Sequence, residues 1–422
     1  MNREALEAFA ADCKKQYEAF QAQGLKLDMS RGKPSPKQLD LTNGITNCLS
    51  EDDYIAAVYH DAPDAERQRR LDGLPEAKAF FAPMLGVKPE DVIVCGNSSL
   101  NIMYWAMSLA MTNGVMGSKP WGKYDKVKVL CPVPGYDRHF AVSEFLGMEL
   151  VNVPMKEDGP DMDIVEKLVA EDDTIKAIWC VPMYSNPGGV VYSDAVVKRF
   201  AALKPKAKDF RIFWDNAYCV HHLVDNPPVQ ANLLEEAKKA GNEDICYMFA
   251  STSKITHPGS GIAVIAASQN NLAYLKKALG FSTIGYDKMN QLRHLRFFGG
   301  KFENLVEHMK KHKALIAPKF QIVESTLEQE LADLDIANWS NPQGGYFISF
   351  NQKGCAKRIV SLCKEAGVVL TGAGASFPHG VDPEDENIRI SPTFPTEEEL
   401  QKAMDVFVCA AKLAAAEQAL AK

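Results

Sequence analysis

Lys254 stands where a lysine could take part in chemistry. It follows the apolar run 245–250, which predicts a buried strand, and its near neighbours include Ser251, Ser253 and glycines that let other groups approach closely. An amine held in a partly dry pocket loses its proton more readily, so it becomes nucleophilic enough to form a Schiff base with a carbonyl. The alternative is an ordinary surface lysine in a loop, because so short a stretch also occurs by chance.

Two further predicted strands end in polar residues that could meet Lys254. Asp215 closes the apolar run 210–214, and a carboxylate in such a place needs a cation or hydrogen-bond donors. Asn186 follows the run 175–181 in a proline-glycine turn. A structural salt bridge would explain Asp215, and turn formation would explain Asn186. Because ligands bind at the carboxyl ends of strands in an open parallel sheet, three polar strand ends favour one shared site.

Other residues in the same pattern could bind anions or planar groups. Ser98 and Ser99 stand between the run 92–95 and a helix, where they could either cap the helix or let its free N–H groups hold a phosphate. Tyr136 follows the next run and brings an aromatic ring to the same edge. Arg389 lies in an apolar strand, so its guanidinium needs a carboxylate from a ligand or from an Asp or Glu of the chain.

The elements that must position these residues predict an α/β fold, with a mostly parallel central sheet and helices on both faces. Short apolar runs alternate with helical segments between residues 74 and 300. The runs are 92–95, 127–131, 150–153, 175–181, 210–214, 245–250 and 262–267. An amphipathic helix over 2–23 precedes this region.

The chain beyond residue 285 is predicted to be helical and then to form a smaller α+β unit. Long helices are expected over 286–313 and 317–334, with His308 and His312 on a solvated face and no metal site, since no acidic or cysteine partner accompanies them. The smaller unit is expected to contain strands at 345–350, 368–371 and 387–391, a helix at 355–367, and a last helix opened by a capping box at 396–399.

Composition indicates a globular protein that handles small molecules. The 422 residues are 46% hydrophobic and 24% charged, and the formal net charge of -7 argues against a general binder of nucleic acid or anionic membranes. The ten cysteines contain no C-x-x-C pair, so we expect free thiols in a reducing cytoplasm. No apolar stretch of membrane-spanning length and no signal peptide is visible, and no membrane partner is expected.

Taken together, these residues resemble the fold-type I pyridoxal-phosphate enzymes and, within them, the class I aminotransferases. The similarity covers nearly the whole chain. The loop sequences at 30–36, 134–139, 290–294 and 387–395 look like those of a bacterial branch of aspartate aminotransferases.

The resemblance implies a role in cofactor binding for most of the candidates. Lys254 would hold pyridoxal 5'-phosphate as a Schiff base and then carry the proton during the reaction. Asp215 would pair with the protonated pyridine nitrogen, while Tyr218 and Asn186 would hydrogen-bond the phenolic oxygen. Tyr136 would stack on the ring. The candidates for the phosphate seat are Ser98, Ser99, Ser251 and Ser253.

The resemblance also implies how substrate and domains are arranged. Arg389 would bind the substrate α-carboxylate beside Asn186, with the backbone at Gly32 on the other side. A large cofactor-binding domain would span residues 46–300, and a small domain would combine 1–45 with 301–422. The family's homodimers share active sites across their interface.

Two departures from the class pattern leave the binding of the phosphate open. Class members commonly carry an arginine seven or eight residues after the lysine, where this chain has Gly261 and Ile262. Ahead of residue 71 the branch usually shows a tyrosine and paired glycines, where this chain has Gln68, Arg69 and Arg70. We therefore expect Arg69 or Arg70 to reach the partner's cofactor, with a solvated or interfacial charge pair as the alternative.

The expected activity is transfer of an amino group between an amino acid, with aspartate favoured, and 2-oxoglutarate. An aminotransferase of another amino acid, or a lyase or decarboxylase with the same cofactor, is the alternative. A regulator that uses the fold only to bind a ligand is not expected, because no additional basic DNA-binding region is seen.

Overall fold

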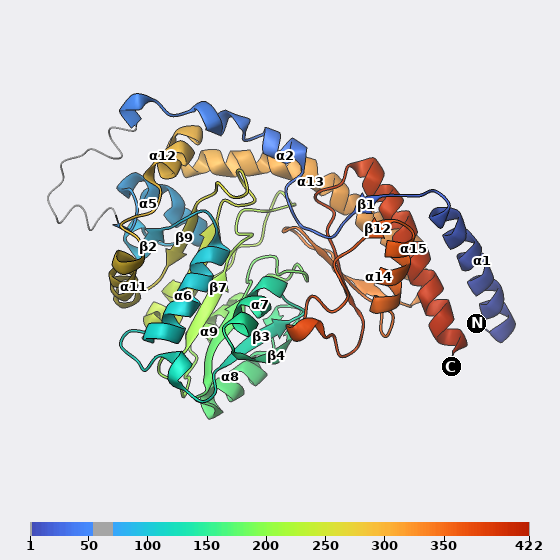
Figure 1. Ribbon diagram of the computed structural model, residues 1–422, viewed down its shortest axis with the longest axis horizontal. Helices are drawn as coiled ribbons and strands as arrows, with labels where there is room; N and C mark the ends of the chain where they lie inside the picture. Colours follow the sequence, from blue (N-terminus) through green and yellow to red (C-terminus); the bar gives the residue numbers. More distant parts are fainter. Residues whose placement is uncertain (1, 54–70, 422) are drawn as a thin grey trace.

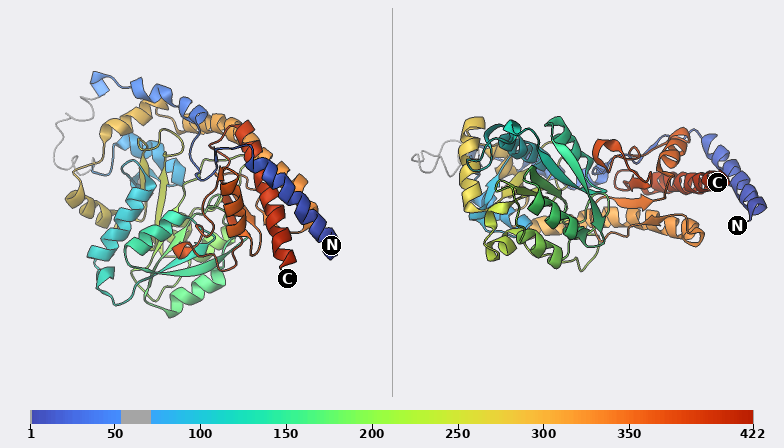
Figure 2. Two further views of the ribbon diagram at one scale, coloured as in Figure 1. Left: turned by 45° about the vertical axis from the view of Figure 1, so that its right-hand side comes forward. Right: turned by 90° about the horizontal axis from the view of Figure 1, so that it is seen from below.

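Residues 2–53 and 71–421 are described by a computed structural model, shown in Figure 1. Their elements form two groups, a large sheet with its helices and a smaller group that contains both ends of the chain. Figure 2 shows that the long helix α13 (Phe302–Leu331) runs from one group into the other. Within the described ranges, no helix is long and apolar enough to cross a membrane.

The large group is built on an eight-stranded, mostly parallel sheet, as the sequence predicted. Its strands, in order across the sheet, are β2 (Val92–Val94), β9 (Ala263–Ala266), β8 (Cys246–Ser251), β7 (Arg211–Asp215), β6 (Ile175–Cys180), β3 (Lys128–Val133), β4 (Glu149–Lys156) and β5 (Gly159–Pro160). The pairs from β8 to β4 are parallel, whereas β9 is antiparallel to both of its neighbours. The carboxyl ends of β2, β8, β7, β6 and β3 therefore meet at one edge.

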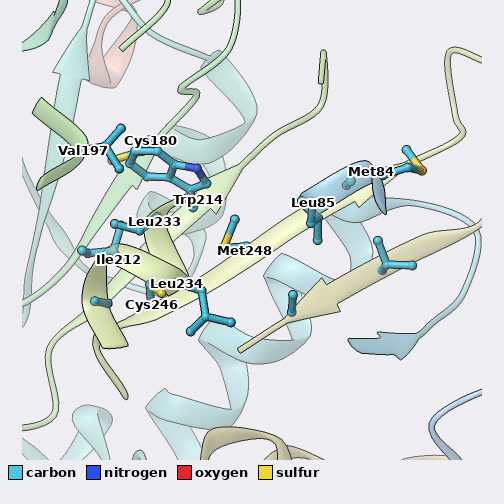
Figure 3. Close-up of a cluster of buried hydrophobic side chains, with 14 of the residues drawn as sticks. Met84, Leu85, Cys180, Val197, Ile212, Trp214, Leu233, Leu234, Cys246 and Met248 are labelled. Carbon is cyan, nitrogen blue, oxygen red and sulfur yellow. The ribbon is translucent and has the colours of Figure 1, made fainter. Parts of the chain in front are cut away.

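Helices cover both faces of this sheet because its strands alternate apolar side chains between two cores. Ile212 and Trp214 of β7 pack on one face with Leu233 and Leu234, as Figure 3 shows, whereas Phe213 belongs to the opposite core. The first face is covered by α5 (Pro75–Phe81), α8 (Met162–Glu171), α9 (Asp194–Ala201) and α10 (Leu233–Lys239), and the second by α6 (Ser99–Asn113), α7 (Asp137–Phe145) and α11 (Gln269–Ser282). Each large apolar side chain buried in this way contributes about 1.5–3 kcal/mol.

The smaller group is an α+β unit assembled from both chain ends. Its strands are β10 (Asn338–Trp339), β11 (Ile348–Asn351) and β13 (Asn387–Ile390) in one antiparallel sheet, with β1 (Leu27–Asp28) paired to β12 (Val368–Val369). Its helices are α1 (Arg3–Gln21), α14 (Ala356–Glu365) and α15 (Glu397–Leu420). The predicted capping box opens α15, since Thr396 and Glu399 each bind the other's main-chain N–H.

The helices after residue 285 are divided differently from the sequence prediction. α12 (Lys288–Phe297) ends before Gly299 and Gly300, whose φ angles of 61° and 70° favour glycine and separate it from α13. The break predicted near residue 315 is wrong, because α13 continues through Pro318. An interior proline costs about 3 kcal/mol. The burial of neighbours such as Ile316 and Phe320 offsets that cost.

His308 and His312 do not lie on the solvated face that was predicted for them. They are 5% and 1% exposed, on the side of α13 that packs against the short helix α2 (Pro36–Asp40). The surrounding lysines suggested a solvated helix, but they occupy the other faces of α13. No pair of the ten cysteines, all within the described ranges, forms a disulfide.

Candidate active site

A pocket at the carboxyl edge of the sheet brings together residues from several strand ends. Its polar lining comprises Ser99, Tyr136, Asn186, Asp215, Tyr218 and Lys254. They follow or end β2, β3, β6, β7 and β8. Strands β8, β7, β6 and β3 lie side by side in the parallel ladder, and β2 is separated from β8 by the antiparallel strand β9. Among the residues that the structure describes, Lys254 is the one cation that lines this pocket.

Lys254 lies three residues beyond the end of β8, with its amine beside aromatic rings. Its Nζ is 5.1 Å from the centre of the Tyr218 ring and 6.0 Å from that of Tyr346. Burial lowers the pKa of Lys254; the carboxylate of Asp215 opposes this shift and the guanidinium of Arg389 adds to it. The amine therefore loses its proton more easily than a solvated lysine does.

Asp215 is a buried carboxylate with one oxygen bonded and one open. Its Oδ2 accepts a hydrogen bond of 3.0 Å from Nε2 of His139, whose ring stacks on Trp179 at a centroid distance of 4.3 Å. Within the described residues, Oδ1 is buried without a partner. Leaving such an acceptor unsatisfied costs about 1–3 kcal/mol. The open oxygen thus fits a ligand with an N–H donor, above all a cationic one.

His139 was given no role in the predicted site, although it lies close in sequence to Tyr136. It belongs to the first turn of α7, and 76 positions separate it from Asp215. A histidine soon after a strand end, facing the strand that ends in a carboxylate, is the signal that could have identified it.

Arg389 is bonded by residues of the chain but keeps part of its donor set open. Its Nη1 donates to Oδ1 of Asp137 at 2.9 Å and to Oδ1 of Asn186 at 3.2 Å. Its Nη2 reaches only Oγ1 of Thr371, at 3.4 Å, and its Nε is buried with no partner in the described part of the chain. The guanidinium lies over the Phe347 ring at 4.8 Å. Asp137 is therefore the structural carboxylate that sequence reasoning left open, and it occupies only one corner of the fork.

Gly32 lies directly against the aromatic ring that supports Arg389. A Cβ added at Gly32 would come within 2.4 Å of Cζ of Phe347, so only glycine fits without displacing that ring. The main chain at Gly32 therefore lies near the guanidinium through this shared contact.

The two tyrosines of the pocket remain hydroxyl donors. Burial raises the pKa of Tyr136, and burial raises that of Tyr218 well above its usual value. Both hydroxyls therefore keep their protons to a higher pH than a solvated tyrosine does. Tyr136 also packs edge-on against His139, at a centroid distance of 4.9 Å.

The candidate serines lie around the start of α6. Ser98 is the N-cap of α6, and its side chain accepts from the main-chain N–H of Asn101 at 3.2 Å. Ser251 donates to Ser253 at 3.1 Å, and Ser253 donates to the main-chain oxygen of Asn97 at 3.2 Å. The loop after β8 is thus bonded to the turn before α6, where free N–H groups favour an anion.

The arginines proposed to complete the phosphate seat lie outside the described residues. Gln68, Arg69 and Arg70 fall within 54–70, so the structure does not test that hypothesis. No group of histidine, cysteine, aspartate and glutamate side chains suited to a metal ion occurs in the described ranges.

Comparison with known proteins finds a matching family and similar relatives over nearly the whole chain. All 422 residues match the family described as aspartate amino-transferase. The aspartate aminotransferase of Corynebacterium glutamicum is 42% identical over 416 residues, covering 98% of this chain and 95% of the relative. A Mycolicibacterium smegmatis protein is 47% identical over 408 residues, covering 96% of this chain and 94% of its own length.

The solved structures give the same result. A crystal structure of an aspartate transaminase from Corynebacterium glutamicum matches with a TM-score of 0.91 and 41% identity, over 99% of this chain and 98% of that one. An α-aminoadipate aminotransferase from Thermus thermophilus, solved with N-(5'-phosphopyridoxyl)-L-leucine, matches with a TM-score of 0.69 over 95% of both chains. At 20% identity it supports the fold alone.

Proposed function

Because the chain belongs to the aspartate amino-transferase family and is an aminotransferase, we propose that it exchanges the amino group of aspartate with 2-oxoglutarate, using pyridoxal 5'-phosphate. The observation that carries the cofactor proposal is the open Oδ1 of Asp215 in the pocket that Lys254 lines. The name of the relative that is 42% identical supports aspartate as the amino donor.

The residues present fit the cofactor. Asp215 would accept the N–H of a protonated pyridine ring through Oδ1, while His139 keeps Oδ2 bonded and fixes the carboxylate. Tyr136 would lie on the ring, and Tyr218 with Asn186 would donate to its phenolic oxygen. When bound, pyridoxal phosphate supplies a carbonyl for the amine and an electron sink that stabilises negative charge at the substrate α-carbon.

Lys254 would carry the proton in the reaction. Its lowered pKa keeps a larger fraction of Nζ neutral at a given pH. The amine can therefore accept the proton from the substrate α-carbon and then donate it to another atom of the reacting molecule. Tyr218, held protonated by burial, cannot compete for that proton. The aromatic walls around Nζ exclude water, and proton exchange with solvent is slowed.

Arg389 would bind the α-carboxylate of the substrate. Its unbonded Nε and weakly bonded Nη2 are the donors left for an incoming carboxylate, since Asp137 and Asn186 hold Nη1. The main chain at Gly32 would lie on the other side of that carboxylate. This arrangement is common to all α-amino acids, so Arg389 does not by itself select aspartate.

The phosphate would bind at the start of α6. Ser98, Ser99, Ser251 and Ser253 surround that turn, but a helix N-terminus supplies only about half a charge. A phosphate dianion needs further positive charge, which supports a homodimer whose partner chain completes the seat. We propose that this homodimer is located in the cytoplasm. Each chain would consist of a large cofactor-binding domain, residues 46–300, and a small domain that combines residues 1–45 with 301–422.

A panel of amino donors with 2-oxoglutarate as acceptor tests the proposed reaction. Aspartate should give the highest kcat/KM, and the single half-reaction should leave pyridoxamine phosphate on the protein. A β-lyase or decarboxylase would consume the amino acid without leaving that form. Spectra of one turnover therefore separate these alternatives from transamination. If another amino acid is the best donor, the proposed substrate is wrong but the proposed reaction is not.

A further inference from the structure

A chain of buried hydrogen bonds runs beneath Lys254 from α2 to the main chain of the Lys254 loop. Gln38 is 1% exposed, and its Nε2 donates to the Tyr346 hydroxyl at 3.0 Å. That hydroxyl donates in turn to the main-chain oxygen of Lys254 at 3.3 Å. The same Nε2 lies 3.2 Å from Nδ1 of His312. One amide group thus contacts two branches, of which the Tyr346 branch leads to the lysine.

The polarity of these branches is set by a single main-chain N–H. Ser35 N donates to Oε1 of Gln38 at 2.9 Å, so the Nε2 end of the amide must face Tyr346 and His312 with its hydrogens. His312 therefore accepts at Nδ1 and carries its proton on Nε2, which lies 3.0 Å from Nε2 of His308. His308 Nε2 then accepts from His312 and has no hydrogen for the main-chain oxygen of Ile255 that lies 3.1 Å away, so this branch ends at His308.

We propose that Gln38 is a positioning residue for Lys254, acting through the Tyr346 hydroxyl on the main-chain carbonyl of Lys254. This inference rests on the proposed function of Lys254 and deepens it. The position of Nζ depends on the main chain from which the four methylenes of the lysine extend, so holding the carbonyl of Lys254 limits where the amine can lie. With that carbonyl held, Nζ stays beside Tyr218.

The position of Gln38 in the sequence also connects the two sides of the site. It lies six residues after Gly32, and the intervening main chain is bonded to the smaller group, since Thr393 donates to the carbonyl of Lys33 at 3.0 Å. Figure 1 shows α2 lying along α13 between the two groups of elements. The segment proposed to meet the substrate carboxylate is therefore linked by hydrogen bonds to the backbone of the lysine.

A positioning residue and a residue that only pairs buried polar groups can be told apart by what their removal does to the pKa of the Lys254 amine. If the carbonyl of Lys254 is released, Nζ gains access to water and the desolvation that lowers its pKa is relieved. A residue that only stabilises the fold lowers the melting temperature and leaves the titration of Lys254 unchanged. The pH midpoint at which Lys254 becomes reactive separates the two roles.

The test uses the full chain without cofactor and compares Gln38→Met, Tyr346→Phe and a control. Methionine keeps the volume of glutamine but has no N–H, and phenylalanine removes only the hydroxyl. Gln352→Met is the matched control, because Gln352 is an equally buried glutamine whose Nε2 donates to the carbonyl of Ala411 in the smaller group. The rate at which Lys254 is acylated by acetic anhydride is followed by peptide mapping across pH.

We expect the midpoint to rise by about one pH unit in Gln38→Met and Tyr346→Phe, which is a tenfold loss of neutral amine at a given pH below the midpoint. Gln352→Met should melt at a lower temperature, but its pH midpoint of Lys254 acylation should equal that of the parent protein. If Gln38→Met does not fold, Tyr346→Phe still decides the question. Parent-like midpoints in the folded variants would overturn the proposal.

The same samples separate this inference from the proposed function. The parent protein, incubated with pyridoxal phosphate and reduced with borohydride, should carry the label on Lys254. A label elsewhere would contradict the proposed function while the acylation midpoints still report on the role of Gln38. A label on Lys254 with unchanged midpoints would contradict the role of Gln38 alone.

Discussion

Lowering the pH from 7 to 5 should destabilise the protein through His294, a histidine that is buried in its neutral form. His294 is 0% exposed; its Nδ1 donates to the carbonyl of Asn290 at 2.9 Å, and its Nε2 lies 3.1 Å from Oγ1 of Thr252 and 3.0 Å from that of Thr256. Nε2 accepts from a hydroxyl and carries no proton. Burial lowers the pKa of His294 to about 4.

The sign and size of this loss of stability follow from the difference between the pKa of His294 in the folded and the unfolded chain. An unfolded histidine titrates near 6.5, so between pH 6.5 and 4 the unfolded chain binds a proton that folded His294 does not. The stabilisation is present above pH 6.5 and is lost as the pH falls toward 4. From pH 7 to pH 5 this amounts to about 2 kcal/mol of the free energy of unfolding. Burial also lowers the pKa of His312, to about 3, so His312 adds a loss of about the same size.

Urea unfolding of the parent and of His294→Gln at pH 7 and pH 5, at one protein concentration, measures this contribution. Glutamine can still accept from the threonine hydroxyls but does not titrate. The variant should be less stable at pH 7, yet lose about 2 kcal/mol less than the parent on going to pH 5. His379→Gln, at an exposed histidine, is the control. If parent and His294→Gln lose the same free energy within about 0.5 kcal/mol, the reasoning about a buried neutral imidazole is wrong.

Three further substitutions address the pocket itself. Asp215→Asn keeps the shape of the side chain but removes the negative charge that would face the pyridine N–H. Cofactor binding should weaken by about 3–5 kcal/mol, as expected for breaking a buried pair, and single-turnover transamination should slow. Unchanged cofactor retention and turnover would contradict the pairing. Arg389→Lys keeps the charge but loses the fork, so transition-state binding should weaken by about 2–5 kcal/mol and kcat/KM should fall at least about 30-fold for every α-amino acid together. An effect confined to dicarboxylic substrates would show that Arg389 binds the substrate side chain instead. Gly32→Ala should displace the buried Phe347 ring, raise KM and lower stability by about 1–3 kcal/mol; an unaltered KM would show that the ring moves freely.

The strands that carry the pocket could be predicted because each is a short apolar run bounded by turn residues. The run before Lys254 and the run ending in Asp215 are buried on both faces of the sheet, so their composition alone marks them as interior strands. The first polar residue after such a run has to lie at the sheet edge. For the same reason Asn186 and Tyr136 could be located at that edge without any knowledge of distances.

The partners of these residues could not be predicted, because they depend on how separate helices dock. His139 meets Asp215 only because α7 starts beside β3 and packs against β7 through Trp179. His308 and His312 stand among lysines, a local pattern typical of a solvated face, and they are buried because α2, the Phe297 and Phe298 rings and the loop after Lys254 pack on that side of α13. The joint between α12 and α13 was placed wrongly because Pro318 is a stronger local signal than the glycine pair that ends α12.

The helix that joins the two groups of elements has a mechanical consequence. With 30 residues, α13 is about 45 Å long at 1.5 Å per residue. Its early turns contact the main chain beside Lys254 through His308, and its later turns belong to the core of the smaller group. A tilt of about 5° at the lysine end would carry the far end through about 4 Å if the helix stays rigid. α13 can therefore act as a lever arm that converts sub-ångström adjustments beside the amine into a displacement of the whole smaller group.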